Sequence, residues 1–384
     1  MKKIYYGRQY IDEADCAAVR EVLLGDYLTT GPKPRELEQR LCELTGASYA
    51  VAIANGTAAL HAACFAVGIG VGDEVITTPM TFAASANCVL YCGGTPVFAD
   101  IEPDTYNISP KAVEALITQR TKAVIAVDFT GQAAKYDELR DICERNNLVL
   151  IGDAAHSIGT KYNGKNTGNV ADITTFSFHP VKTVTGGEGG AVLTNSKEYY
   201  NKLLLFRTHG ITRNQAQMDS PSDDYWYYEQ LELGYNYRLT DFQAALIISQ
   251  LDKLDMFAAR RKEIVKLYNE ALSEVPEIIL QKEIPQSDTV RHLYIIQLNY
   301  GLLKCTRREF FDAMAEKGII CNVHYIPVYY HPYYWQLGYE KGLCPVAERV
   351  YEGVLSLPLY YSLTDDDVMD VIAAVRKVVR FHRK

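Results

Sequence analysis

The feature that most constrains the fold is a regular alternation of short apolar runs with amphipathic stretches between Ala50 and Asn195. Short apolar runs bounded by turn residues indicate buried strands, and the longer stretches with helical periodicity indicate helices. We expect strands at AVAIAN (50–55), DEVITTP (73–79), TPVFADI (95–101), KAVIAVDF (122–129), LVLIGDA (148–154), ITTFSF (173–178) and GAVLTN (190–195), and helices at 56–67, 82–93, 111–119 and 135–147. This α/β pattern predicts a mostly parallel mixed sheet flanked by helices, with a ligand site at the carboxyl ends of the strands.

The rest of the chain predicts an arm and a second domain. Residues 1–45 look like a helix and a glycine-proline turn lying across the large domain, and 240–273 keep a helical period long enough to bridge two domains. Beyond it, strands at 291–298 and 319–326 and helices at 306–318 and 364–381 suggest a smaller C-terminal α+β domain. We therefore expect an N-terminal arm and large domain over 1–250 and a small C-terminal domain over 251–384, a division that 384 residues allow.

Charge and composition exclude several classes of function. A net charge of -8 argues against a nucleic-acid partner, because phosphate backbones select basic surfaces. The N-terminus lacks the apolar core of a signal peptide, and no run approaches the length of a membrane span, so we expect a cytoplasmic protein with no membrane partner. The nine cysteines are scattered and never form C-x-x-C, and we expect neither a disulfide framework nor a metal site.

One apparent nucleotide-binding motif is a turn. GIGVGD (68–73) resembles a dinucleotide loop, but it precedes a strand instead of following one, and its sixth residue is Asp73. The sequence therefore lacks the main motif that would indicate a nicotinamide-dependent dehydrogenase.

Four stretches place chemically useful residues at the predicted strand ends. Asn55, Gly56 and Thr57 lie where a helix begins, and free N–H groups there can hold a phosphate. Asp153 ends an apolar strand, and Phe82 and Lys182 each lie just beyond one. Each of these features, taken singly, is more often structural. A residue such as Asn55 usually caps a helix, an acid such as Asp153 usually belongs to a turn, a ring such as Phe82 usually packs in the core, and a lysine such as Lys182 usually lies on the surface.

Taken together, the four stretches suit pyridoxal phosphate. This cofactor needs a lysine amine for a Schiff base, a carboxylate that keeps its ring nitrogen protonated, an aromatic face and a phosphate cup. Lys182, Asp153, Phe82 and the 55–57 turn supply one candidate for each need. The glycines of GGEGG after Lys182 allow the backbone to pass close to the cofactor.

The block from Asp153 to Asn195, DAAHSIGTKYNGKNTGNVADITTFSFHPVKTVTGGEGGAVLTN, closely resembles the DegT/StrS family of sugar-nucleotide aminotransferases. LTTGPKPRELEQRL, NGTAALHAA, VITTPMTFAASAN, RTHGI, LGYNYRLTDFQAAL and VHYIPVY match the family pattern in the same order. The resemblance covers nearly the whole chain and implies the fold-type-I aminotransferase fold with pyridoxal 5'-phosphate as cofactor.

The resemblance also implies roles for individual residues. Lys182 would carry the cofactor and shuttle protons, and Asp153 would pair with its ring nitrogen. Cofactor contacts would come from Thr57, Ala58 and Ser177 at the phosphate, Phe82 and Ala155 on the two ring faces, His156 at the ring hydroxyl, and Asn236 from the other subunit of a homodimer with shared active sites. Substrate contacts would come from His179, Arg238, His324 and Tyr329.

The implied reaction transfers an amino group from L-glutamate to the keto carbon of a nucleotide sugar. SFHPVKTVTGGEGG and VHYIPVYY are closest to the branch that aminates C4 of UDP-4-keto-6-deoxy-N-acetyl-L-altrosamine in pseudaminic acid synthesis. Alternatives are another 4-keto or 3-keto nucleotide sugar, of the bacillosamine, perosamine or 4-amino-arabinose type, and a regulatory protein that binds the cofactor without catalysis.

Overall fold

A seven-stranded sheet forms the centre of the computed structural model, which describes residues 2–384. The strands are β2 (Tyr49–Ile53), β3 (Glu74–Thr77), β4 (Thr95–Phe98), β5 (Thr121–Val127), β6 (Val149–Asp153), β9 (Ile173–Ser177) and β10 (Gly190–Thr194). Their order is β2-β10-β9-β6-β5-β3-β4, in which β10 is antiparallel to both neighbours and the run from β9 to β4 is parallel. The predicted mostly parallel mixed sheet is confirmed.

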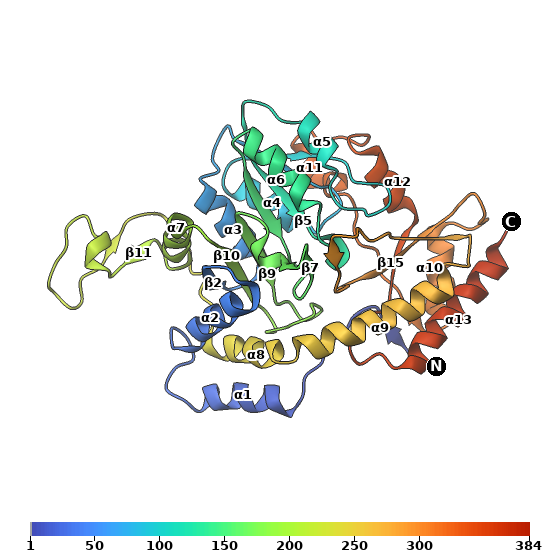
Figure 1. Ribbon diagram of the computed structural model, residues 1–384, viewed down its shortest axis with the longest axis horizontal. Coiled ribbons are helices and arrows are strands. Elements are labelled where there is room, and N and C mark those ends of the chain that lie inside the picture. Colours follow the sequence, from blue (N-terminus) through green and yellow to red (C-terminus); the bar gives the residue numbers. More distant parts are fainter. Residues whose placement is uncertain (1) are drawn as a thin grey trace.

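Helices cover both faces of this sheet (Figure 1). They are α3 (Gly56–Val67), α4 (Ala84–Tyr91), α5 (Pro110–Ala115), α6 (Tyr136–Arg145) and α7 (Lys197–Arg207). Successive side chains of a strand point to opposite faces, so Val124 packs in the cluster that contains Leu139 of α6, and Ile125 in the one that contains Ala63 of α3. Burial on both faces explains why these strands are almost continuously apolar.

The N-terminal arm and the bridging segment contain more helices than the sequence pattern indicates. They are α1 (Glu13–Leu23), α2 (Lys33–Thr45), α8 (Asp241–Leu251) and α9 (Leu254–Leu272). The single helix expected over 240–273 is divided at Asp252 and Lys253, although α8 and α9 still follow one another beneath the sheet (Figure 1). At the division, the Lys253 ammonium lies 2.8 Å from Asp12 and 2.6 Å from Asp15 of the arm. The partners of Lys253 are distant in sequence, and helical periodicity carries no information about them.

The C-terminal part has its own antiparallel sheet, with the strand order β13-β15-β17. Its elements are β13 (Ile278–Leu280), β15 (Tyr294–Leu298), β17 (Val354–Leu357), α10 (Arg307–Glu316), α11 (Pro332–Gln336), α12 (Pro345–Gly353) and α13 (Asp365–His382). One apolar cluster joins β13, β15 and β17 to α9, α10 and α13. The domain boundary near residue 250 stays a prediction.

The strand expected over 319–326 was too long. Only β16 (Ile319–Ile320) is regular, and it pairs in parallel with β1 (Ile4–Tyr5). Asn322 still pairs with Ser356 of β17, whereas the residues from Val323 to Ile326 form no strand and line a cavity, which is described below.

Short elements complete the chain. They are β7 (Lys161–Tyr162), β8 (Lys165–Asn166), β11 (Ile211–Thr212), β12 (Glu229–Gln230), β14 (Ser287–Asp288), and the 3-10 turns η1 (Phe129–Gly131), η2 (Thr167–Asn169), η3 (Gln215–Gln217) and η4 (Val328–Tyr330). The segment around β11 extends away from the rest of the molecule (Figure 1). Within residues 2–384, no helix has both the length and the apolar character that crossing a bilayer requires.

Candidate active site

A cavity of about 870 Å³ lies at the carboxyl ends of β5, β6 and β9, next to the start of α3. This is the position that the strand order predicts for a ligand site. Ten of the residues proposed from the sequence line it: Thr57, Ala58, Phe82, Asp153, Ala155, His156, Ser177, His179, Lys182 and His324.

The start of α3 forms one end of the cavity. The Asn55 side chain caps this helix by accepting a hydrogen bond from the Ala58 N–H at 2.8 Å, while the Asn55 backbone stays extended. A Cβ added to Gly56 would lie 2.7 Å from the Ser177 Cβ, so glycine allows the helix to approach the end of β9. Backbone N–H groups and the positive end of the helix dipole suit this turn to an anion such as phosphate.

Asp153, the last residue of β6, is buried at the floor of the cavity. Its Oδ2 accepts a hydrogen bond from the Ser85 hydroxyl at 2.6 Å, and its Oδ1 accepts one from the Ala155 N–H at 3.2 Å. Burial raises the pKa of this carboxyl group, while the two hydrogen bonds and the charge of Lys182 act in the opposite direction. The ordered anion could hold a proton on a ring nitrogen.

Lys182 follows β9 and faces the same cavity. Burial lowers the pKa of its amine to about 8, an effect that the charge of Asp153 partly opposes. Within residues 2–384, Lys182 forms no ion pair that would keep its amine protonated. A desolvated lysine of this kind can lose its proton and act as a nucleophile.

Phe82 presents an apolar face to the cavity. Its side chain is 62% exposed, although it belongs to a loop whose neighbours Thr81 and Ser85 are buried. Ala155 lines the same cavity with a small side chain. An exposed aromatic ring beside a cavity suits stacking on a flat heterocycle.

A buried histidine cluster lies on the remaining wall. His156 Nε2 is 3.2 Å from the Tyr325 hydroxyl, and its ring centroid is 4.6 Å from that of His292. Burial lowers the pKa of His156 and His292 well below the usual histidine value, so both imidazoles are neutral. Sequence reasoning missed His292, which lies in a run interpreted only as a strand, and it chose Tyr329 instead of Tyr325 in the VHYIPVY segment. Both missed residues line the cavity.

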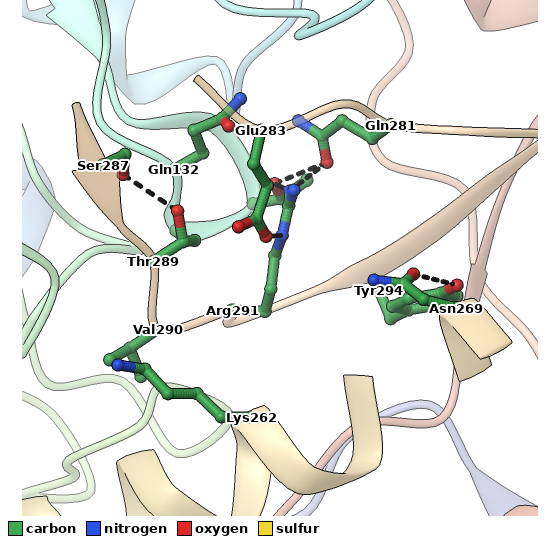
Figure 2. A network of polar contacts seen from close by, with 12 residues as sticks. Gln132, Lys262, Asn269, Gln281, Glu283, Ser287, Thr289, Val290, Arg291 and Tyr294 are labelled. Atoms are coloured by element: carbon green, nitrogen blue, oxygen red, sulfur yellow. Dashed lines mark hydrogen bonds and ion pairs between the residues drawn. The ribbon is translucent and has the colours of Figure 1, made fainter. Parts of the chain in front are cut away.

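The residue before His292 anchors this wall to the large sheet. The Arg291 guanidinium is 3.0 Å from Glu283 and 2.6 Å from the Thr130 hydroxyl, and it also contacts Gln281. Figure 2 shows Arg291 at the centre of this polar network. The His292 N–H donates to the Thr130 carbonyl at 2.8 Å, so η1 and the C-terminal part together position His292.

Three proposed residues lie outside the cavity. The Tyr329 prediction requires correction, because this side chain is buried against Phe98 and its hydroxyl donates to Glu348 at 2.7 Å. Tyr325 is the tyrosine of that segment that reaches the cavity. Asn236 and Arg238 follow the β11–β12 segment and do not line the cavity of their own chain, and the Asn236 side chain is exposed.

Comparisons with known proteins agree with this geometry. The model of the DegT/DnrJ/EryC1/StrS aminotransferase family matches residues 9–376. The spore coat polysaccharide biosynthesis protein SpsC of Bacillus subtilis is 40% identical over 98% of this chain and 97% of the relative. UDP-4-amino-4,6-dideoxy-N-acetyl-beta-L-altrosamine transaminase of Campylobacter jejuni is 37% identical over 98% of both chains.

Solved structures show the same similarity. Helicobacter pylori PseC, an aminotransferase of pseudaminic acid biosynthesis, superimposes with a TM-score of 0.92 at 32% identity, over 99% of this chain and all of PseC. A sugar aminotransferase from Streptococcus pneumoniae, solved in its PLP form, also gives a TM-score of 0.92, at 31% identity over 99% of both chains. This chain belongs to the DegT/DnrJ/EryC1/StrS aminotransferase family.

Proposed function

We propose that the protein uses pyridoxal 5'-phosphate to transfer an amino group from L-glutamate to C4 of a UDP-linked 4-keto-6-deoxy-N-acetylhexosamine of L-altro configuration. The observation that carries this proposal is one cavity that brings together the Lys182 amine, the Asp153 carboxylate, the Phe82 ring and the start of α3. These four groups suit the four chemical parts of the cofactor.

The residues present fit this cofactor. The α3 turn with Thr57, Ala58 and Ser177 would hold the phosphate, and Phe82 and Ala155 would enclose the ring. When bound, pyridoxal phosphate supplies an aldehyde that exchanges amino groups and a ring that withdraws electrons. Asp153 would keep a proton on the ring nitrogen, and the neutral His156 would contact the ring hydroxyl.

Lys182 has two proposed tasks. Its amine is the attachment point for the cofactor, and a pKa of about 8 makes the neutral form accessible near neutral pH. Once displaced by the amino donor, the same amine would take a proton from the substrate carbon and return it on the other side of the transfer.

The proposed active unit is a homodimer with shared sites. Asn236 is exposed and lies outside its own cavity, and the nearby segment before β12 presents Tyr225 at 97% and Trp226 at 72% exposure. Aromatic rings exposed to this degree suit a protein interface. The partner's Asn236 would complete the phosphate end of each site.

The proposed sugar rests on the segment around His324. His324, Tyr325, Ile326 and His331 line the cavity from the C-terminal part, and Tyr6 joins them from the arm. Such a mixture of rings and polar edges suits uracil and a deoxygenated sugar. Two relatives described above are named for the same pathway or product.

Initial rates with two epimeric substrates test the proposal. Purified protein reconstituted with pyridoxal phosphate is given L-glutamate and either the L-altro or the D-xylo UDP-4-keto-6-deoxy-N-acetylhexosamine. We expect faster amination of the L-altro sugar. Faster turnover of the D-xylo sugar would move the protein to a bacillosamine-type reaction, and a protein that binds no cofactor would contradict the proposal as a whole.

A further inference from the structure

Two buried hydroxyl groups lie beside the Asp153 carboxylate, on residues that also line the cavity. Thr81, after β3, is 3% exposed, and Ser85, in the first turn of α4, is 1% exposed. The two hydroxyl oxygens are 2.8 Å apart, and the Ser85 oxygen is 2.6 Å from Asp153 Oδ2. Both side chains are almost completely buried, and each hydroxyl group has a hydrogen-bond partner within this chain of contacts.

The direction of this chain follows from the chemistry of its ends. An ionised carboxylate only accepts hydrogen bonds, so the single Ser85 proton points to Asp153. The Thr81 hydroxyl then donates to the Ser85 oxygen. Hydrogen bonds that end on a charged acceptor are stronger than neutral ones, and a chain of donors polarises each member.

Apart from the hydrogen bond from the Ala155 N–H, Asp153 has few other means of keeping its charge. The titratable groups that face it are Lys182 after β9, Asp128 after β5, Cys88 on α4, Tyr136 on α6 and Tyr325 from the C-terminal part. Lys182 is the cation among these groups and lowers the pKa of Asp153, while the charge of Asp153 raises the pKa of the buried Asp128. The hydroxyl chain therefore supplies stabilisation that the surrounding charges do not.

The same short loop also carries Phe82. The Ser85 N–H donates to the Phe82 carbonyl at 3.2 Å, so the backbone that directs Ser85 toward Asp153 also fixes the position of Phe82. One five-residue segment, TFAAS (81–85), thus connects the ring face of the cavity to its acid.

We infer that Ser85, supported by Thr81, is a positioning residue that holds the Asp153 carboxylate in its anionic form and aims it into the cavity. The inference rests on the proposed function, because the anion matters for a ring nitrogen only if pyridoxal phosphate binds there.

The pH dependence of cofactor affinity tests this role. The dissociation constant of pyridoxal 5'-phosphate is measured by equilibrium dialysis over an acidic to neutral pH series, for the wild type and for Ser85→Ala. Losing a donor to an anion favours the protonated acid, so the acid midpoint of binding should move up by about one to two pH units. Between the two midpoints, binding should weaken by about tenfold or more, with little change at higher pH.

Three further variants separate positioning from packing. Ser85→Thr keeps the hydroxyl and should retain the wild-type midpoint, and Thr81→Val should move the midpoint in the same direction by less. Thr174→Val is the matched control, because Thr174 on β9 pairs with Gly152 of β6 and its buried hydroxyl has no hydrogen-bond partner among residues 2–384. It should leave the midpoint unchanged.

An unchanged midpoint in both Ser85→Ala and Thr81→Val overturns the inference. A loss of cofactor affinity in Ser85→Ala that is the same at every pH also overturns it. If circular dichroism shows that Ser85→Ala does not fold, Thr81→Val alone decides. A wild-type protein that binds no cofactor at any pH overturns the proposed function and the inference with it, whereas normal binding with an unmoved midpoint overturns the inference alone.

Discussion

At the scale of single residues, chemistry and burial together distinguish Lys182 from the other lysines. Its position after β9 turns it into the cavity, where desolvation lowers the pKa of its amine to about 8. An exposed lysine, such as Lys197 at the start of α7, lacks this environment. The role proposed for Lys182 is therefore chemical, and its charged form is a cost to the folded state.

Lys182→Met should abolish transamination and stabilise the cofactor-free protein at neutral pH. The folded amine has the lower pKa, so the unfolded chain binds more protons between about pH 8 and the ordinary lysine value. Wild-type stability should rise through that window, and the advantage of the variant, about 1–3 kcal/mol at pH 7, should disappear.

Urea unfolding of both proteins at several pH values measures this difference. The exposed Lys197→Met controls for the loss of a surface lysine. A constant difference between wild type and Lys182→Met from pH 7 to pH 11 would contradict the assigned burial.

At the scale of elements, α3 links local sequence to the proposed phosphate site. The Asn55 cap and Gly56 begin the helix where the sequence pattern places it, and Ala58, Ala59, Ala62, Ala63 and Ala66 pack on the sheet. The small side chains allow close approach to β9 and β10. The first turn is consequently fixed in position before any ligand binds.

Changes at Asn55 should separate helix capping from anion binding. Asn55→Ala removes the hydrogen bond to Ala58 and should destabilise the protein by about 1 kcal/mol. Asn55→Asp keeps an acceptor for that N–H and should retain stability, but its charge should weaken binding of the cofactor phosphate by about tenfold or more.

Thermal unfolding without cofactor and titration with pyridoxal phosphate give the two quantities. Equal affinity in Asn55→Asp and wild type would show that the phosphate lies elsewhere.

At the scale of the whole molecule, the cavity of one chain is incomplete for the proposed contacts. The segment around β11 extends from the body of the protein (Figure 1). Asn236, which follows this segment and pairs with Thr208 at the end of α7, lies outside its own cavity. A second copy is the partner that we propose for this segment.

Mixing two inactive variants tests this arrangement. A mixed dimer of Lys182→Ala and Asn236→Ala chains contains one site with both wild-type residues if each site draws on both chains. Some activity should return, approaching half that of the wild type in verified mixed dimers. If Asn236→Ala alone is inactive and mixed dimers show no recovery, sharing through Asn236 is excluded.

The sequence by itself determined the alternation of strands and helices, the bounds of α3, and the placement of Asp153 and Lys182 at strand ends. These features depend on local periodicity and on residue chemistry, and both can be identified from the amino-acid sequence alone. The family pattern added His156, Ser177 and His324, all of which the structure brings to the same cavity as Phe82.

Only the tertiary structure decided which distant groups meet. The side-chain donor to Asp153 is Ser85, 68 positions earlier, and the hydroxyl that contacts His156 belongs to Tyr325, 169 positions later. Tyr325 and Tyr329 are indistinguishable as sequence letters, yet one lines the cavity and the other is buried against Phe98. Hydrogen bonds and packing between distant segments are fixed by the folded backbone, which local sequence patterns do not encode.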